Sequence, residues 1–234
     1  LLFGAGTSGR LAVVEAAELP PTFGTDPRRV RAVMAGGRSA VFRAREGAED
    51  RGEEGDRAAS RLRPRDLAIG VSASSVTPFV RGALSRARRR GARTVLVTAS
   101  GSAGLDAIAD VIVRLSVGPE VLAGSTRLKA GTATKLALNQ ITTSALAASG
   151  KVYGPWMVDL RAGSAKLKDR SRRIVAAASG VSARRAASLL SRAGGEVKTA
   201  ILMGRTGSNA KDARVLLTRS TGDLRTALGR KRGR

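Results

Sequence analysis

Short apolar runs alternate with longer amphipathic stretches along the first half of the chain. Four runs have the length of a β-strand, at residues 30–35, 66–71, 94–98 and 111–115, and a fifth ends at Phe3. Strands that alternate with helices at this spacing are typical of βαβ units and of a parallel sheet with helices on both faces. We therefore predict an α/β fold of three layers, αβα, with a mostly parallel sheet.

Proline positions and local composition predict where the helices between these strands begin and end. The first helix ends at Leu19, because Pro20 and Pro21 forbid its continuation and force an extended connection. Pro78 suits the first turn of a helix that runs to Arg90. Further helices are expected over 40–44, in a charged stretch that ends at Arg61, and over 129–149.

Beyond Asp159 the pattern changes to short, charged helices, which we expect over 164–178, 182–193 and 196–203. Gly180 and the pair at 194–195 are expected to close them. The predicted domains are therefore a domain over 1–160, a small helical subdomain over 161–204 and a helical or disordered basic tail over 205–234. Because Leu1 lies within an apolar strand, we also expect the natural protein to carry residues before it.

Cysteine and histidine are both absent from the 234 residues. Their absence excludes disulfides, thiolate metal sites, the usual zinc ligands and the usual general base near neutral pH. No metal site is therefore predicted. Acid–base chemistry must come from carboxylates, lysine or the single tyrosine, Tyr153.

A net charge of +24 raises the possibility of a nucleic-acid partner. The basic residues are spread along every segment, and aromatic residues make up only 3% of the chain, so no stacking platform for bases is evident. We interpret the excess as a solvated, arginine-rich surface that ends in a disordered basic tail at 230–234. Binding to nucleic acid rests on charge alone, and no apolar run is long enough to cross a membrane.

The turn after Phe3 has the features of a phosphate site. Thr7 and Ser8 place hydroxyl groups at the start of a helix, where backbone N–H groups and the helix dipole favour an anion. Three glycines allow a ligand to approach the backbone closely, at positions 4, 6 and 9.

Two other interpretations of this turn remain open. The glycines satisfy the dinucleotide fingerprint G-x-G-x-x-G, but its acidic ribose partner is missing after the second strand, where Arg38 stands. Alternatively, the glycines only pack a helix against a sheet. That alternative does not explain the polar cluster of Thr7, Ser8 and Arg10.

A second hydroxyl-rich loop follows the strand at 66–71 and contains Ser72, Ser74 and Thr77. The carboxyl ends of parallel strands lie at one edge of a sheet, where ligands of α/β proteins bind. The two loops are therefore expected to form a phosphate cradle. The alternative for these side chains is ordinary turn and N-cap chemistry.

Longer motifs resemble those of the sugar isomerase (SIS) fold, in particular the N-acetylmuramic acid 6-phosphate etherases. The resemblance runs from Leu1 to about Met203 and is most distinctive at the STRLKAGTA string. The motifs are GAGTSGRL at 4–11, ELPPTFG at 18–24, EGAED at 46–50, GPEVLAGSTRLKAGTATKLALN at 118–139, GKVYG at 150–154 and MVDL at 157–160.

The resemblance implies a cytoplasmic, cofactor-free homodimer that acts in peptidoglycan recycling. Such an enzyme is a carbon–oxygen lyase, which cleaves the lactyl ether of N-acetylmuramic acid 6-phosphate to N-acetylglucosamine 6-phosphate and D-lactate by elimination followed by hydration. The alternative is a SIS module that binds a sugar phosphate without catalysis, as the glucokinase regulatory protein does. The helices at about 173–203 also resemble the family's small ubiquitin-associated-like bundle.

The family's two catalytic glutamates correspond to Glu18 and Glu49. Glu18 is expected at the end of a helix, where the dipole disfavours the anion, as suits an acid that protonates the departing lactate. Glu49 is expected to begin the next helix, where the anion is favoured, as suits the base that takes the C2 proton. Without the resemblance, Glu49 would be read as a surface carboxylate among acidic neighbours.

By motif position, Ser125 and Lys129 are expected to face the sugar, although Lys129 also suits a helix-start cation without a ligand. The second loop departs from the family's ASGRTP. Ser75 replaces the glycine, and we expect it to resist a positive φ and to crowd the phosphate. Val76 replaces the arginine and removes a cation, and Arg38 stands where a family glutamate usually follows AGG.

Overall fold

The computed structural model describes residues 1–160 and 162–229 and divides into two compact units. The first, here called the sheet unit, comprises Leu1–Glu18 and Pro27–Ile141. The second, here called the helical unit, comprises Leu19–Asp26 and the chain from Thr142 onward. The basic tail expected at 230–234 lies outside the described residues.

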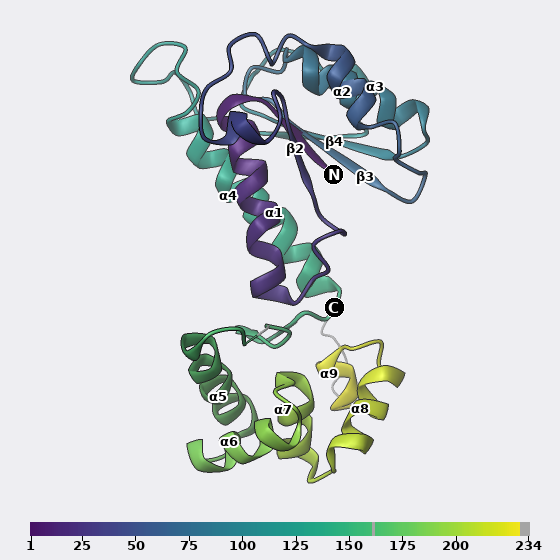
Figure 1. The fold of residues 1–234 in the computed structure, drawn as a ribbon, viewed down its shortest axis with the longest axis vertical. Coiled ribbons are helices and arrows are strands. Elements are labelled where there is room, and N and C mark those ends of the chain that lie inside the picture. Colours follow the sequence, from purple (N-terminus) through teal and green to yellow (C-terminus); the bar gives the residue numbers. More distant parts are fainter. Residues whose placement is uncertain (161, 230–234) are drawn as a thin grey trace. The chain divides into compact units, whose positions relative to one another are not determined.

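Five parallel strands form the sheet of the first unit (Figure 1). They are β1 (Leu2–Gly4), β2 (Ala32–Met34), β3 (Leu67–Val71), β4 (Arg93–Thr98) and β5 (Val111–Arg114), in the order β2-β1-β3-β4-β5. Every neighbouring pair is parallel, which confirms the predicted sheet. The strand order reverses between β1 and β3, and ligands of such sheets bind at this switch point.

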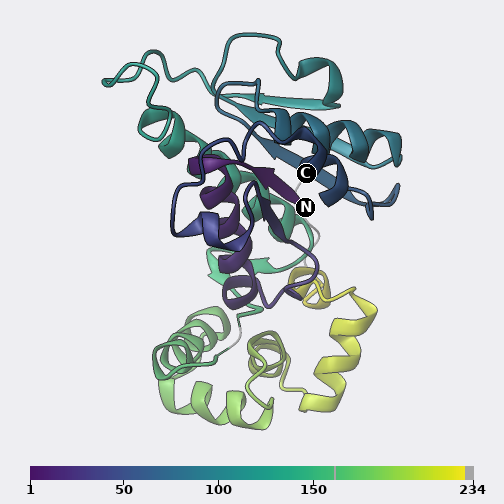
Figure 2. The same ribbon diagram turned by 45° about the horizontal axis from the view of Figure 1, so that its top comes forward.

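Helices cover both faces of the sheet, so the predicted three-layer α/β fold is confirmed (Figures 1 and 2). Side chains alternate across β1: Leu2 joins a cluster with Ala12 and Leu138, whereas Phe3 joins the opposite cluster with Phe79 and Leu84. One face carries α2 (Gly52–Ala58) and α3 (Pro78–Arg89), and the other carries α1 (Gly6–Phe23) and α4 (Lys129–Ala148).

Two glycines allow α2 and α3 to approach closely. A β-carbon at Gly55 would overlap the carbonyl oxygen of Phe79, and one at Gly82 would overlap the carbonyl oxygen of Gly52. Neither clash involves a flexible side chain, so only glycine fits at this helix crossing.

The first helix is longer than predicted, because it continues through Pro20 and Pro21 to Phe23. The expected end at Leu19 is therefore wrong. Proline's fixed φ is compatible with a helix, although the helix loses the two hydrogen bonds that the missing N–H groups would donate. The end is set by Gly24, which has a φ of +61° and donates its N–H to the carbonyl of Pro20 at 2.9 Å.

The helix expected over 40–44 is also wrong, since that segment is a short 3₁₀ helix, η1 (Arg38–Val41). A second 3₁₀ helix, η2 (Asp106–Ile108), lies between β4 and β5. Several arginines donate to backbone carbonyls in this unit, such as Arg88 to Ala107 at 2.6 Å and Arg90 to Leu62 at 3.1 Å. Part of the arginine excess is therefore structural.

Five helices share one hydrophobic core in the helical unit. Ile174 of α5, Leu189 of α6, Ile201 of α7, Leu217 of α8 and Leu224 of α9 all belong to it. The elements of this unit are β6 (Val152–Tyr153), β7 (Trp156–Met157), α5 (Ala165–Ser179), α6 (Ala183–Arg192), α7 (Val197–Thr206), α8 (Ala210–Arg219) and α9 (Leu224–Ala227).

The three helices predicted beyond Asp159 correspond to α5, α6 and α7, and the two short strands β6 and β7 pair antiparallel. Ser164 and Ser182 cap α5 and α6 by accepting backbone N–H bonds. Across the described residues, no helix combines the length and apolarity needed to cross a bilayer.

Candidate functional site

The glycine turn joins the end of β1 to the first turn of α1. Gly4 and Gly9 lie in contact: a β-carbon at Gly4 would lie 2.7 Å from the Gly9 nitrogen, and one at Gly9 would lie 2.8 Å from the Gly4 oxygen. Gly6 has a φ of +50°. Packing therefore explains two of the glycines, and backbone conformation explains the third. Thr7 and Ser8 lie in the first turn of α1 and are half-buried.

The second hydroxyl loop lies beside this turn at the same edge of the sheet, because Gly4 of β1 pairs with Val71 of β3. The Ser72 and Thr77 hydroxyls form a 2.8 Å hydrogen bond, and Ser72 is buried. Ser74 is exposed. The structure thus brings the two predicted loops together, with Ser72 and Thr77 partnered by each other and Ser74 open to solvent.

Ser75 adopts the left-handed conformation that we expected serine to resist, with a φ of +60°. Its side chain is fully buried and its Oγ accepts the N–H of Leu105 at 3.2 Å. A β-carbon at Gly104 would overlap the Ser75 carbonyl oxygen, so the neighbouring loop packs tightly here. The expectation that serine resists a positive φ here was wrong, and the hydrogen bond from Leu105 holds the hydroxyl in this conformation.

Glu49 lines a small cavity beside the glycine turn. The cavity has a volume of about 120 Å³, and its wall includes Gly6, Arg10, Glu46 and Glu49. Arg10 does not point a free cation into it: Nε donates to the Val41 carbonyl at 2.8 Å and Nη2 to the Ala40 carbonyl at 2.9 Å. Arg10 therefore fixes the segment that leads to Glu49.

Glu49 does not begin a helix, contrary to prediction, because α2 starts at Gly52 with Arg51 as its N-cap. The segment 46–50 instead forms turns, and the N–H of Phe79 donates to the Glu49 carbonyl at 2.9 Å. This bond anchors the backbone of Glu49 to the start of α3, while its side chain remains exposed.

Glu18 lies on an exposed part of α1 and is not among the residues that line the Glu49 cavity. It follows Gly6 by twelve residues, about 18 Å along the helix axis. The helix continues to Phe23, so the premise that Glu18 ends it is wrong, and the helix dipole gives little support for an acidic role there.

The start of α4 lies against the start of α1. A β-carbon at Gly131 would lie 3.5 Å from Cγ2 of Thr7, which places the α4 N-terminus beside the predicted phosphate turn. Lys129 is the first residue of α4 and is exposed, and Ser125 precedes it in a half-buried position. The backbone at the start of α4, which Lys129 opens, therefore lies close to Thr7.

Glu120, which no sequence motif had singled out, caps α4. Its two carboxylate oxygens accept the N–H groups of Ala130 at 3.0 Å and Lys129 at 2.9 Å. These bonds, first that from Ala130, hold the pKa of Glu120 below its ordinary value of 4.5. The loop before α4 is thus tied to the helix by an ionised carboxylate.

We expect this cap to be lost only in acid. Because the folded pKa is lowered, the stabilisation is fully present above pH 4.5 and disappears as the pH falls through the lower, folded value. In NMR titrations the amide signals of Lys129 and Ala130 should shift with a midpoint below 4.5. Glu120→Gln should remove that transition. A midpoint at or above 4.5 would contradict the cap.

A part-buried ion pair joins α1 to α4 and was also missed from the sequence. Glu15 is 3% exposed, and its Oε2 lies 2.9 Å from Nζ of Lys135. Lys135 also donates to Oδ1 of Asn139 at 2.5 Å. The pair fixes the helix that carries Glu18, one turn before that residue.

Comparison with known proteins gives three kinds of match. Residues 1–88 match the family described as the glucokinase regulatory protein N-terminal SIS domain. The N-acetylmuramic acid 6-phosphate etherase of Geobacillus thermodenitrificans is 51% identical over 202 residues, which cover 86% of this chain and 68% of that protein. The etherase of Rubrobacter xylanophilus is 53% identical over 201 residues, 85% of this chain and 67% of that protein.

A solved structure of the Vibrio vulnificus NanR protein complexed with ManNAc-6P is also similar. Its TM-score is 0.44 and its sequence identity 21%, and the match covers 63% of this chain and 49% of that chain.

Proposed function

The chain belongs to the N-acetylmuramic acid 6-phosphate etherase family, and we propose that it cleaves the lactyl ether of N-acetylmuramic acid 6-phosphate. The products are N-acetylglucosamine 6-phosphate and D-lactate, so the enzyme is a carbon–oxygen lyase of amino-sugar catabolism in peptidoglycan recycling. The observation that carries the proposal is the match of about half of the aligned residues to etherases along most of the chain. A cytoplasmic location is part of the proposal, since phosphorylated sugars do not cross a bilayer unaided.

The hydroxyl-rich edge of the sheet supports binding of the 6-phosphate. Thr7 and Ser8 offer hydroxyls at the positive end of α1, and Ser74 is open to solvent on the neighbouring loop. Ser72 and Thr77 form the base of that loop through their mutual hydrogen bond.

We assign Ser125 and Lys129 to the sugar, because the α4 N-terminus packs against Thr7.

The proposed chemistry is elimination followed by hydration. Ring opening exposes the C1 aldehyde, which makes the C2 proton acidic. Glu49 takes that proton, the C3–O bond breaks, and Glu18 protonates the departing D-lactate oxygen. Water then adds at C3 while a proton returns to C2, so each turnover consumes a water and releases a lactate.

The separation of the two glutamates along one chain favours a site shared within a homodimer. Glu18 is about 18 Å along α1 from Gly6, whereas Glu49 shares a cavity with Gly6. We propose that Glu18 of one copy acts on sugar held beside Glu49 of the other. Exposed Val14 on α1 and Leu136 on α4 offer apolar surface for such contact.

Mixing two inactive variants tests this arrangement. If each site uses one glutamate from each copy, an equal mixture of Glu18→Ala and Glu49→Gln chains regains about a quarter of the normal activity, because half of the dimers are mixed and each holds one intact site. The variants must be refolded together so that subunits exchange, and each alone serves as the control. A mixture that stays inactive while forming mixed dimers contradicts the shared site.

A coupled assay for D-lactate released from N-acetylmuramic acid 6-phosphate tests the function itself. We expect release by this chain, or by a version extended with a relative's N-terminal segment, and loss of release in Glu18→Ala. Tight binding of the sugar phosphate without release by either version would instead support the non-catalytic regulatory module, to which the match over residues 1–88 corresponds.

A further inference from the structure

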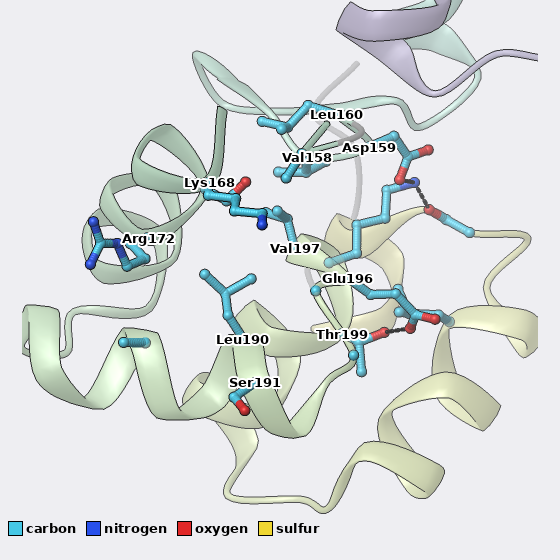
Figure 3. Close-up of a pocket in the computed structure, with 18 residues that line it drawn as sticks. Val158, Asp159, Leu160, Lys168, Arg172, Leu190, Ser191, Glu196, Val197 and Thr199 are labelled. Atoms are coloured by element: carbon cyan, nitrogen blue, oxygen red, sulfur yellow. Dashed lines mark hydrogen bonds and ion pairs between the residues drawn. The ribbon is translucent and has the colours of Figure 1, made fainter. Parts of the chain in front are cut away.

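A cavity of about 910 Å³ lies within the helical unit and contains none of the residues assigned to the sugar phosphate (Figure 3). Its wall combines the segment around Val158 and Leu160 with side chains of α5, α6, α7 and α8. Most of the wall is apolar, and the volume falls in the range of about 300 to 1,000 Å³ that is usual for small-molecule sites. Such a cavity needs an occupant with an apolar body.

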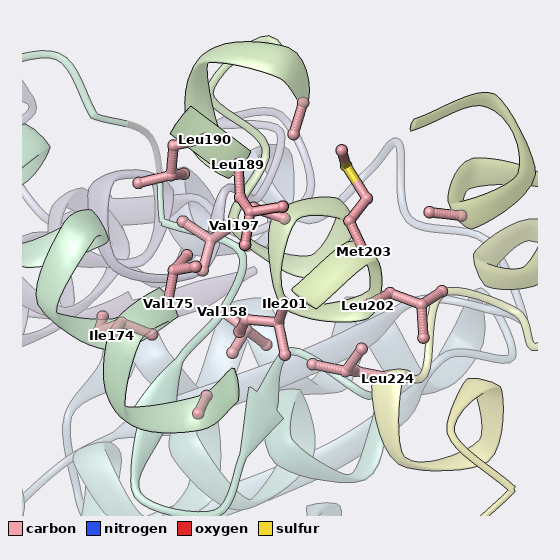
Figure 4. Close-up of a cluster of buried hydrophobic side chains, with 14 of the residues drawn as sticks. Val158, Ile174, Val175, Leu189, Leu190, Val197, Ile201, Leu202, Met203 and Leu224 are labelled. Carbon is pink, nitrogen blue, oxygen red and sulfur yellow. The ribbon is translucent and has the colours of Figure 1, made fainter. Parts of the chain in front are cut away.

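The apolar wall is rigidly supported. Val158, Leu190 and Val197 line the cavity and are also members of the core of the helical unit (Figure 4). They are 1%, 8% and 3% exposed, so each is held by packing on its other sides. The cavity is therefore a feature of the folded unit and not of a loose surface segment.

The first turn of α7 forms a polar part of the wall. Val197, Lys198 and Thr199 all line the cavity and are all buried. The N-cap residue Glu196 makes no capping bond; its Oε2 accepts from Thr199 Oγ1 at 2.7 Å and from Arg214 Nε at 2.9 Å. The backbone N–H groups of this first turn therefore donate no hydrogen bond to the side chain of the N-cap residue.

Most charged groups of the wall are paired. Lys198 lies 2.8 Å from Asp159 and donates to the Gly222 carbonyl at 2.7 Å, and Arg172 pairs with Asp169 at 2.9 Å. Lys168 of α5 differs, because its side-chain ammonium makes no ion pair or hydrogen bond with any residue that the structure describes. The unbalanced charge of the wall is therefore positive.

We propose that this cavity binds a small organic anion with an apolar body. Its anionic group is attracted by Lys168 and by the start of α7, and its apolar part packs against Leu160, Leu190 and Leu217. The site is separate from the proposed etherase chemistry and does not depend on it.

Fluorescence titration with 1-anilinonaphthalene-8-sulfonate tests the site on the whole chain, since this probe has an apolar ring system and one sulfonate. We expect saturable binding to a single site on the native protein, and displacement by octanoate but not by inorganic phosphate. Competition by phosphate would show that charge alone is recognised, and binding without saturation would show non-specific adsorption. Either result overturns the proposal.

Paired variants locate the probe. Lys168→Gln should weaken binding about fivefold, whereas Lys166→Gln, an exposed lysine on the same helix outside the wall, should leave it unchanged. Ala187→Phe should fill the cavity and abolish binding, and Ala183→Phe on the exposed start of α6 is its control. If Ala187→Phe fails to fold, Ser191→Phe repeats the test from an exposed wall position. Unchanged affinity in folded cavity variants refutes the site.

Discussion

Glu49→Gln is expected to lower the rate of D-lactate release from N-acetylmuramic acid 6-phosphate by about 10³-fold, within the usual range for loss of a general base. The amide keeps the size of the side chain but cannot accept the C2 proton. The backbone of Glu49 remains anchored by the Phe79 N–H, and its side chain is exposed, so the fold should be unaffected. Steady-state kinetics should show the loss in kcat, with little change in KM.

Glu53→Gln provides the matched control. Glu53 is an exposed carboxylate on α2, four residues after Glu49, and it does not line the Glu49 cavity. It experiences the same general surface potential, so a specific role for Glu49 predicts normal turnover in Glu53→Gln. Equal losses in both variants, or normal turnover in a folded Glu49→Gln protein, would remove Glu49 from the mechanism.

Gly82→Ala is expected to destabilise the sheet unit by about 3 kcal/mol, at the upper end of the usual cost of overpacking. The added β-carbon would overlap the Gly52 carbonyl oxygen, and Gly55 makes the reciprocal close approach to Phe79. Relief requires α2 to move away from α3, which also moves the backbone near Glu49. Denaturant unfolding followed by circular dichroism measures the change in free energy.

Gly101→Ala separates this steric effect from a general cost of replacing glycine. Gly101 has no heavy atom within 4 Å of its would-be β-carbon and does not have a positive φ. Its replacement should change the unfolding free energy by only a few tenths of a kcal/mol. If Gly82→Ala is equally mild, the helices approach one another less closely than the structure shows.

Much of the sheet unit follows from local patterns. β-branched runs marked the strands, and Pro78 marked the start of α3, which the structure places at that residue. The first helix was misjudged because proline rules describe local cost, whereas packing and the Gly24 cap determine where α1 ends. The end of α1 therefore depends on tertiary contacts that the local proline rule does not include.

The candidate site was predictable only where motifs and sheet topology agree. Thr7 and Ser72 follow adjacent parallel strands, so their loops had to meet at one edge. The Glu120 cap and the Glu15–Lys135 pair depend on residues 9 to 120 positions apart in the chain, which no periodicity links. The roles of Glu18 and Glu49 remain predictions. Both were argued from a position at a helix end, and neither residue lies at one, because α1 continues to Phe23 and α2 begins at Gly52.

The division between the two units falls inside helices, after Glu18 in α1 and after Ile141 in α4. Continuous helices transmit unfolding cooperatively, so the two units are expected to exchange their most protected amide hydrogens in a linked manner. The links are unequal, because Pro20 and Pro21 cannot donate to the carbonyls one turn earlier. Local unfolding that spreads between the units should therefore start beside Glu18 in α1. The α4 segment, which keeps its backbone hydrogen bonds, should unfold later.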